Sequence, residues 1–171
     1  CEGYTDVIGF ARAGLPAAVA TCGTALTEEH VKLLRRYARK LVLSFDADSA
    51  GQAAAERFYQ WEKDHEIEVT VADLPPGVDP ADLASSDPER LAQAVEQAVP
   101  FLKFRVDRVL GGADLGTVEG RARAAEAAID VIREHPSELV RDQYVMEGAG
   151  RTRIPHEQLR EMLRRPAPAP R

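Results

Sequence analysis

Apolar and polar positions in the first hundred residues follow the pattern of strands alternating with helices. Buried or half-buried strands are predicted at the apolar or alternating runs 1–2, 17–20, 41–45 and 67–71. Helical spacing of apolar residues predicts helices at 5–13, after the N-cap candidate Thr27, and at 50–61. Strands and helices in this order form a mostly parallel sheet with helices on its faces and right-handed crossovers. The pattern therefore predicts an α/β fold.

After residue 98 the pattern is helical only. Helices are predicted at 118–133, 137–147 and 155–164, after an apolar segment at 101–110. Their core candidates are Ala124, Ala128, Ile132, Leu139, Tyr144 and Val145. We expect an α/β domain over 1–98, a helical subdomain over 99–165 that packs as support for the sheet, and a Pro/Ala-rich linker over 166–171.

Composition narrows the class of protein. The 171 residues are 44% hydrophobic and 29% charged, enough for one core and a smaller satellite domain. No apolar stretch approaches the roughly twenty residues of a membrane helix, and the N-terminus lacks the basic and apolar regions of a signal peptide. We expect a cytoplasmic protein without membrane contact. Cys1, Cys22 and the four histidines lack the spacing of a zinc site, so no zinc is expected.

The formal net charge of −6 argues against unaided binding of nucleic acid, because cation contacts to phosphates supply most of that affinity. One basic concentration stands out, made of Lys32, Arg35, Arg36, Arg39 and Lys40. Its four-residue repeats indicate a solvated helix face. Contact with nucleic acid is the alternative interpretation.

Two carboxylates follow the apolar run 41–45. Side chains alternate in an extended backbone, so Asp46 and Asp48 point to the same side just beyond the carboxyl end of the strand. One interpretation is that they serve as a helix cap and a turn residue. The other is that they bind a cation.

Acids also follow two further strand exits. Glu2 precedes Asp6 by one helical turn, and the proline-rich loop 74–83 carries Asp79 and Asp82. Ligands gather beyond the carboxyl ends of parallel strands, and several carboxylates in one place repel unless cations bridge them. Oxygen ligands select hard ions such as Mg²⁺ or Mn²⁺, which also accept phosphate oxygens. This arrangement indicates chemistry at phosphorus.

Four motifs in order resemble the TOPRIM domain of bacterial DNA primases. They are Glu2-Gly3-Tyr4-Thr5-Asp6, Gly23-Thr24-Ala25, Asp46-Ala47-Asp48-Ser49-Ala50-Gly51 and Leu74-Pro75-Pro76-Gly77-Val78-Asp79-Pro80. The resemblance covers about residues 1 to 110 by motif and the helical tail by pattern only. It implies that residues 1–98 are a TOPRIM domain with a truncated first strand.

The resemblance also implies roles for individual residues. Glu2, Asp46 and Asp48 are the expected catalytic and metal-binding acids, and Asp6 and Asp79 are further metal ligands. The family commonly has another Asp where this chain has Ala81, so Asp82 is expected only in an outer-shell or water-mediated contact. Gly3 and Gly51 allow close approach of the backbone to a phosphate. Glu2 either ligates a metal or accepts the hydroxyl proton.

A primase joins ribonucleotides on a single-stranded DNA template, so the resemblance implies nucleotidyl transfer from nucleoside triphosphates to an RNA primer with release of pyrophosphate. More than one Mg²⁺ or Mn²⁺ ion is expected. Further expected partners are the replicative helicase and single-strand-binding protein of the replisome, through regions outside this chain. The chain is expected to be a fragment that binds metal but primes weakly or not at all. A TOPRIM nuclease and a non-catalytic TOPRIM binding module are the alternatives.

Overall fold

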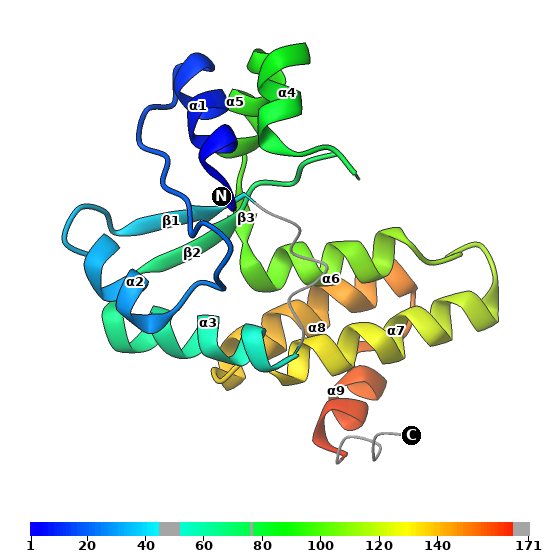
Figure 1. The fold of residues 1–171 in the computed structure, drawn as a ribbon. Helices are drawn as coiled ribbons and strands as arrows, with labels where there is room; N and C mark the ends of the chain where they lie inside the picture. Colours follow the sequence, from blue (N-terminus) through cyan, green and yellow to red (C-terminus); the bar gives the residue numbers. More distant parts are fainter. Residues whose placement is uncertain (45–51, 76, 166–171) are drawn as a thin grey trace. The chain divides into compact units, whose positions relative to one another are not determined.

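The computed structural model describes residues 1–44, 52–75 and 77–165, with the backbone alone at 52–56 (Figure 1). The chain divides into two compact units, Cys1–Phe101 and Leu102–Arg171. The first unit contains the sheet and five of the described helices, and the second is helical. The α/β class expected from the sequence is confirmed.

The described sheet has the strand order β1-β2-β3, formed by β1 (Lys40–Leu43), β2 (Glu68–Val71) and β3 (Val99–Pro100). β1 and β2 are parallel, with Lys40 level with Glu68 and Leu43 level with Val71. β3 runs antiparallel to β2. The sheet is therefore mixed, with the parallel pair predicted from 41–45 and 67–71 beside a short antiparallel strand.

The helices of the first unit are α1 (Tyr4–Arg12), α2 (Glu28–Leu34), α3 (Gln52–His65), α4 (Pro80–Ser86) and α5 (Pro88–Glu96). Side-chain caps explain three of their starts. Thr27, Asp79 and Asp87 each accept a hydrogen bond from the backbone amide three residues ahead. Proline follows the cap in α4 and α5, where its missing N–H costs nothing.

Aromatic side chains of α3 form the core between this helix and the following segments. Phe58, Tyr59 and Trp61 are buried, and the rings of Phe58 and Trp61 meet edge to face with centroids 5.4 Å apart. Phe58 also contacts Phe101 edge to face at 5.0 Å. Such pairs contribute about 0.5–1.5 kcal/mol each beyond area burial.

Two segments that the sequence predicted to be strands do not form strands in the structure. Residues 1–2 and 17–20 have no strand assignment, although the amides of Thr21 and Cys22 donate to the carbonyls of Cys1 and Glu2 at 3.2 and 2.9 Å. The two segments therefore pair through a short stretch of backbone that is not long enough to form a regular strand ladder.

The predicted helix through the basic residues is also shorter than expected. α2 ends at Leu34, and the amides of Arg36 and Tyr37 donate to the carbonyls three residues back, at 3.2 and 2.9 Å. This turn redirects the chain into β1, which begins at Lys40. The cations after Leu34 therefore lie on this turn, in the segment that follows it and at the start of β1, and not on a helix face.

α1 and α4 pack closely because of Gly9. A Cβ added to Gly9 would lie 3.0 Å from Ala84 Cβ and 3.1 Å from Ala81 Cα. Glycine thus permits a backbone approach that a side chain would prevent. This contact adjoins a core cluster of Phe10, Leu83, Ala84 and Leu91.

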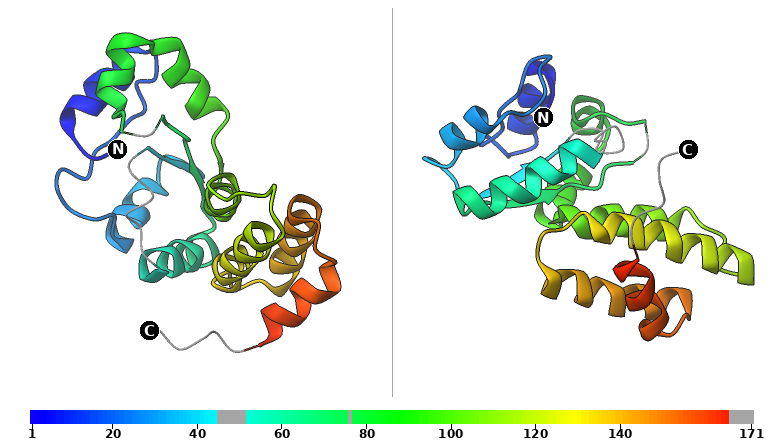
Figure 2. Two further views of the ribbon diagram at one scale, coloured as in Figure 1. Left: turned by 90° about the vertical axis from the view of Figure 1, so that its right-hand side faces the viewer. Right: turned by 90° about the horizontal axis from the view of Figure 1, so that it is seen from below.

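The second unit consists of α6 (Phe101–Gly111), α7 (Val118–Arg133), α8 (Glu138–Thr152) and α9 (His156–Arg164), with Phe101 itself counted in the first unit. α7, α8 and α9 contact one another, and Figure 2 shows α7 and α8 side by side, coloured yellow to orange. The predicted core residues Ala124, Ala128, Ile132 and Val145 are buried. Leu139 is 76% exposed, so its assignment to the core was wrong.

Ion pairs connect α6 to the helices that follow. Lys103 Nζ lies 3.1 Å from Glu147 Oε1, and Arg151 pairs with Asp107. Arg105 pairs with Glu134 through both carboxylate oxygens, and both side chains are largely buried. Because this last pair is largely buried, removing one partner would leave an uncompensated charge and should destabilise the protein more than breaking either of the other two pairs. Among the described helices, none has the length and apolar character needed to cross a bilayer.

We predict that Gly9→Ala destabilises the first unit by about 1–3 kcal/mol, because the added methyl group forces α1 away from α4. The single tryptophan, Trp61, reports unfolding of this unit in urea by fluorescence. The control is Gly150→Ala in α8, where a Cβ meets nothing within 4 Å. Followed by circular dichroism, that change should stabilise by about 0.5–1 kcal/mol. Equal stabilisation by both changes would contradict the close contact.

A second prediction concerns Glu62, which accepts a hydrogen bond from the Val69 amide at 2.9 Å. Burial raises the pKa of this carboxyl above its ordinary value of 4.5, against the lowering effect of that hydrogen bond. The folded state therefore holds the proton more tightly than the unfolded state, and stability falls as pH rises from 4.5 through the folded pKa. Glu62→Gln removes this loss and should be more stable than the parent at pH 7.

The gain from Glu62→Gln should shrink as the pH falls below 4.5, where the parent carboxyl is protonated in both states. Urea unfolding at pH 7 and pH 4 measures the difference. Glu126→Gln, at an exposed position of α7, is the control. A gain for Glu62→Gln that is the same at both pH values would show that the effect is not electrostatic.

Candidate metal site

The carboxyl ends of β1 and β2 lie at the same edge of the sheet. Their parallel register pairs Leu43 with Val71, and the Ala72 amide donates to the Leu43 carbonyl at 2.9 Å. The chain thus leaves both strands side by side. The segment with the paired acids follows β1, and the proline-rich acidic loop follows β2. This is the edge at which ligands gather in parallel sheets.

Ser44 is the last described residue after β1. Its side chain is buried, with 3% of the residue exposed, and its Oγ makes no hydrogen bond within the described part of the chain. Asp46, Asp48 and Gly51 come next and lie outside the described residues. A polar residue that interrupts an apolar strand just before two acids was the sequence signal for this buried hydroxyl, which our sequence analysis passed over.

Asp6 orders the turn that carries Glu2. The Asp6 side chain is buried, with 6% of the residue exposed, and its Oδ2 accepts the amides of Glu2 at 3.2 Å and Gly3 at 3.0 Å. These bonds satisfy amide groups at the start of α1, and the positive end of the helix favours the carboxylate. Asp6 therefore fixes the backbone from which the exposed Glu2 side chain extends.

A second set of backbone bonds holds Glu2 from the other side. Its carbonyl accepts the Cys22 amide at 2.9 Å. The Thr24 hydroxyl donates to the Thr21 carbonyl at 2.9 Å, which closes the turn containing the Gly-Thr motif. Gly23 in this turn has a φ of 84°, a conformation that favours glycine. The first two motifs are thus parts of one local structure.

Gly3 has an ordinary extended conformation, with a φ of −120°. A Cβ there would make only ordinary contacts, 3.5 Å from Thr5 Oγ1 and 3.9 Å from Asp6 Oδ2. The local fold therefore does not itself require glycine at this position.

Asp79 and Asp82 lie at the start of α4. Asp79 Oδ1 accepts the Asp82 amide at 2.7 Å, so Asp79 is the N-cap of the helix. Both residues are exposed. Ala81 lies against α1 at Gly9, so position 81 belongs to the helix contact. The Asp that follows it is in the exposed first turn, one step further around the helix.

The residues that precede the two acidic turns pack against one core cluster. Cys1, directly before Glu2, and Val78, directly before Asp79, both pack against the cluster of Phe10, Leu83, Ala84 and Leu91. The packing of α1 on α4 adds to this arrangement (Figure 1). Within the described residues, no three metal-ligating side chains approach closely enough to hold an ion. The paired acids that would complete such a set fall in the segment that the structure does not describe.

Comparison with known families gives two matches. Residues 1–84 match the Toprim-like family, and residues 102–157 match the family described as the DnaB-helicase binding domain of primase. The second match falls on the helical segment that we interpreted as support for the sheet. It differs from the expectation that a helicase-binding region would lie outside this chain.

Known proteins agree with these matches. The DNA primase of Streptomyces coelicolor is 35% identical over 87% of this chain and 24% of its own length. The RNA polymerase domain of Mycobacterium tuberculosis primase DnaG, solved with double-stranded DNA, has a TM-score of 0.72 and 34% identity over 88% of this chain and 50% of that chain. A DnaG primase catalytic domain bound to ssDNA has a TM-score of 0.60 and 31% identity over 92% of this chain and 51% of that chain.

The chain thus spans about a quarter of the length of the curated relatives it matches. The Toprim-like match, the match to the helicase-binding domain of primase and the likeness to primase structures all agree. The chain belongs to the bacterial DnaG-type DNA primase family.

Proposed function

We propose that this chain is the Toprim and helical part of a primase that synthesises short RNA primers on single-stranded DNA. The observation that carries the proposal is the placement of Glu2 and Asp79 directly after Cys1 and Val78, which share one core cluster. The family's catalytic set requires these two turns to meet. The structures solved with DNA for related primases support a nucleic-acid substrate.

In this proposal each acidic residue has its own role at the metal site. Asp46 and Asp48 hold divalent ions, Mg²⁺ or Mn²⁺, and Glu2 either adds a ligand or accepts the proton of the attacking 3′-hydroxyl. Asp6 and Asp79 contribute carboxylate oxygens beyond those that cap α1 and α4. Asp82 acts through water from the exposed first turn of α4. When bound, the ions neutralise charge on the phosphoryl oxygens.

The remaining groups orient the nucleoside triphosphate. Gly3 leaves room for a phosphate beside the Glu2 backbone, because it has no side chain and no atom lies closer than ordinary contact distance to the position that a Cβ of residue 3 would take. Gly51, which comes directly before α3 in the sequence, is assigned the same role, and the free amides of a helix N-terminus suit a phosphate. Bond formation releases pyrophosphate and extends the RNA by one nucleotide.

The proposed partners follow from the same assignment. The second unit contacts the replicative helicase, which is supported by the helicase-binding family match over 102–157. α8 exposes the apolar side chains of Leu139 and Met146, which suit a protein partner. Nucleoside triphosphates, template DNA, RNA primer and single-strand-binding protein complete the set, at replication forks in the bacterial cytoplasm.

We predict that Asp6→Asn and Asp79→Asn each weaken Mn²⁺ binding to this chain by at least about tenfold. An asparagine oxygen still accepts the backbone amides that each aspartate caps, so the thermal unfolding transition should stay near that of the parent. Titration calorimetry measures the affinity. Asp87→Asn is the matched control, because Asp87 caps α5 in the same way and should leave ion binding unchanged. Equal affinity of all four proteins would remove Asp6 and Asp79 from the ion site.

In the full-length protein, Asp46→Asn and Asp48→Asn should each reduce primer synthesis by roughly 100-fold or more. Incorporation of labelled ribonucleotides on a single-stranded DNA template measures synthesis. The isolated chain should bind Mn²⁺ but extend no primer. Cleavage of labelled single strands by the full-length protein without nucleotides, lost in the same variants, would favour the nuclease alternative instead.

A further inference from the structure

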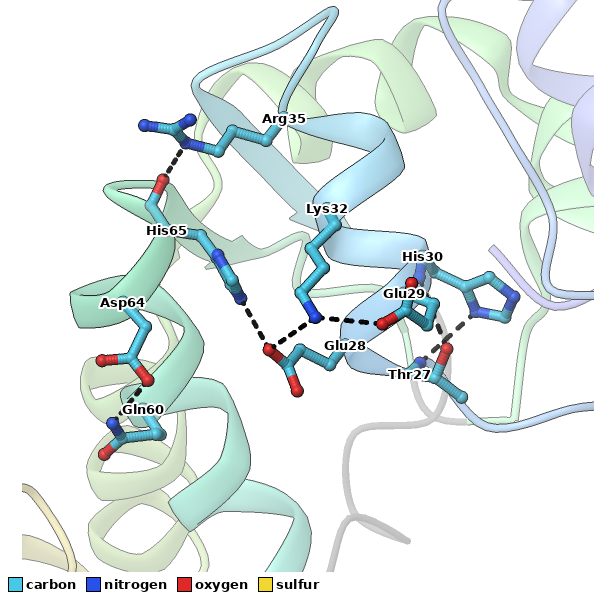
Figure 3. A network of polar contacts seen from close by, with 9 residues as sticks. All are labelled: Thr27, Glu28, Glu29, His30, Lys32, Arg35, Gln60, Asp64 and His65. Carbon is cyan, nitrogen blue, oxygen red and sulfur yellow. Dashed lines mark hydrogen bonds and ion pairs between the residues drawn. The ribbon is translucent and has the colours of Figure 1, made fainter.

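The structure separates the basic residues between positions 32 and 40 into two groups. The first group is held within the protein. Lys32 Nζ lies 3.1 Å from Glu28 Oε1 and 3.0 Å from Glu29 Oε1, and Arg35 Nε donates to the His65 carbonyl (Figure 3). The Lys32 ion pairs lie within α2, and the Arg35 hydrogen bond joins the end of α2 to the end of α3. Both cations thus have a structural role.

Arg39 also belongs to the first group, because Arg39 and Arg35 both face Glu66 Oε2, at 3.9 and 3.3 Å. Arg36 and Lys40 form the second group. Both are exposed, and neither makes a side-chain hydrogen bond or ion pair within the described part of the chain. Arg36 and Lys40 are therefore available to an external anion.

An exposed aromatic ring lies between these two cations in sequence. Tyr37 is 82% exposed, and Leu33, one turn earlier, is also exposed. The turn itself is ordered, because the Tyr37 and Ala38 amides both donate to the Leu34 carbonyl, at 2.9 and 3.0 Å. The ring therefore extends from a fixed backbone. We call Arg36, Tyr37 and Lys40 the Tyr37 corner.

We propose that the Tyr37 corner binds single-stranded nucleic acid, with a base stacked on the Tyr37 ring and phosphates beside Arg36 and Lys40. We choose an anionic partner because of charge complementarity. The nearby carboxylate of Glu66 is already paired with Arg35 and Arg39, so it does not neutralise Arg36 or Lys40. Glu68 is the register neighbour of Lys40 on β2, and the four arginines and lysines from 35 to 40 outweigh these two acids. An exposed aromatic beside cations is how proteins bind single strands without reading their sequence.

The position of the corner indicates which part of the strand it contacts. Lys40 begins β1, whose other end leads toward Asp46. The four residues of β1 span about 13 Å, which corresponds to about four stacked nucleotides at 3.4 Å each. We assign the bound strand as template DNA a few nucleotides from the site of bond formation. This assignment rests on the proposed function, whereas binding to the corner does not.

The test is fluorescence anisotropy with labelled single-stranded DNA and RNA of one sequence, in low salt with EDTA and no nucleotides. Tyr37→Ala should weaken DNA binding about fivefold or more, and Tyr37→Phe should bind as the parent does, because it keeps the stacking face. The double change Arg36→Gln and Lys40→Gln should weaken binding and flatten its salt dependence. Lys32→Gln removes the same type of charge from a paired position and should change binding less than about twofold.

Unchanged binding by Tyr37→Ala, equal losses in Tyr37→Ala and Lys32→Gln, or a loss in Tyr37→Phe would each overturn the proposal. So would a parent chain that does not bind. Tighter binding of RNA than of DNA would overturn the template assignment alone. Because the assay contains EDTA, failure of the metal site leaves it unaffected, and failure of the Tyr37 corner leaves the Mn²⁺ titrations unaffected. Matching thermal unfolding of Tyr37→Ala and parent excludes a folding defect.

Discussion

The close contact between α1 and α4 at Gly9 is the constraint on which the candidate site depends. Each helix begins directly after a turn that carries acids, so the distance between the helices sets the distance between those turns. The contact is possible only because residue 9 has no side chain, and Ala81 and Ala84 on the facing helix are small. Phe10 and Leu83 then supply the apolar burial that makes the approach favourable.

The same carboxylates that would hold ions also begin the helices. Asp6 and Asp79 each accept a hydrogen bond from a backbone amide at the start of a helix, where the helix dipole favours negative charge. The fold can therefore place these acids without a cation present. The helix dipole also reduces the negative potential at each carboxylate, which weakens the attraction of each acid for a hard ion.

The parts of the fold predicted from sequence are those with local signals. α7 begins and ends at the residues that its apolar spacing predicts, 118 and 133, and the pair β1 and β2 follows from two apolar runs. The helix end at Leu34 was missed because no glycine or proline marks it. The turn is instead fixed by contacts to a distant segment, such as Arg35 to the His65 carbonyl. Leu139 was misassigned because it does not share a helix face with Val145.

For the candidate site, the sequence identified which acids to examine but not what holds them. The capping bonds of Asp6 are local, because they reach only the amides of Glu2 and Gly3. The shared cluster under Cys1 and Val78 instead depends on packing between segments almost eighty residues apart, which no local pattern encodes. The resemblance to primases supplied the set of acids, and the structure shows that the residues before two of their turns pack against one core cluster. The roles of Asp46 and Asp48 rest on the resemblance and on the direction of β1.

In the proposed function, cations at the start of β1 and acids that follow β1 in the sequence suit a protein that acts on a polyanion. Acids that hold divalent ions repel phosphates until the ions are bound, so they cannot also supply the affinity for a long strand. That affinity has to come from cations elsewhere, in a chain whose 28 acidic residues outnumber its 22 lysines and arginines. Arg36 and Lys40 remain free because Glu66 is occupied by their neighbours. The ion pairs of Arg35 and Arg39 thus determine which cations a nucleic acid can reach.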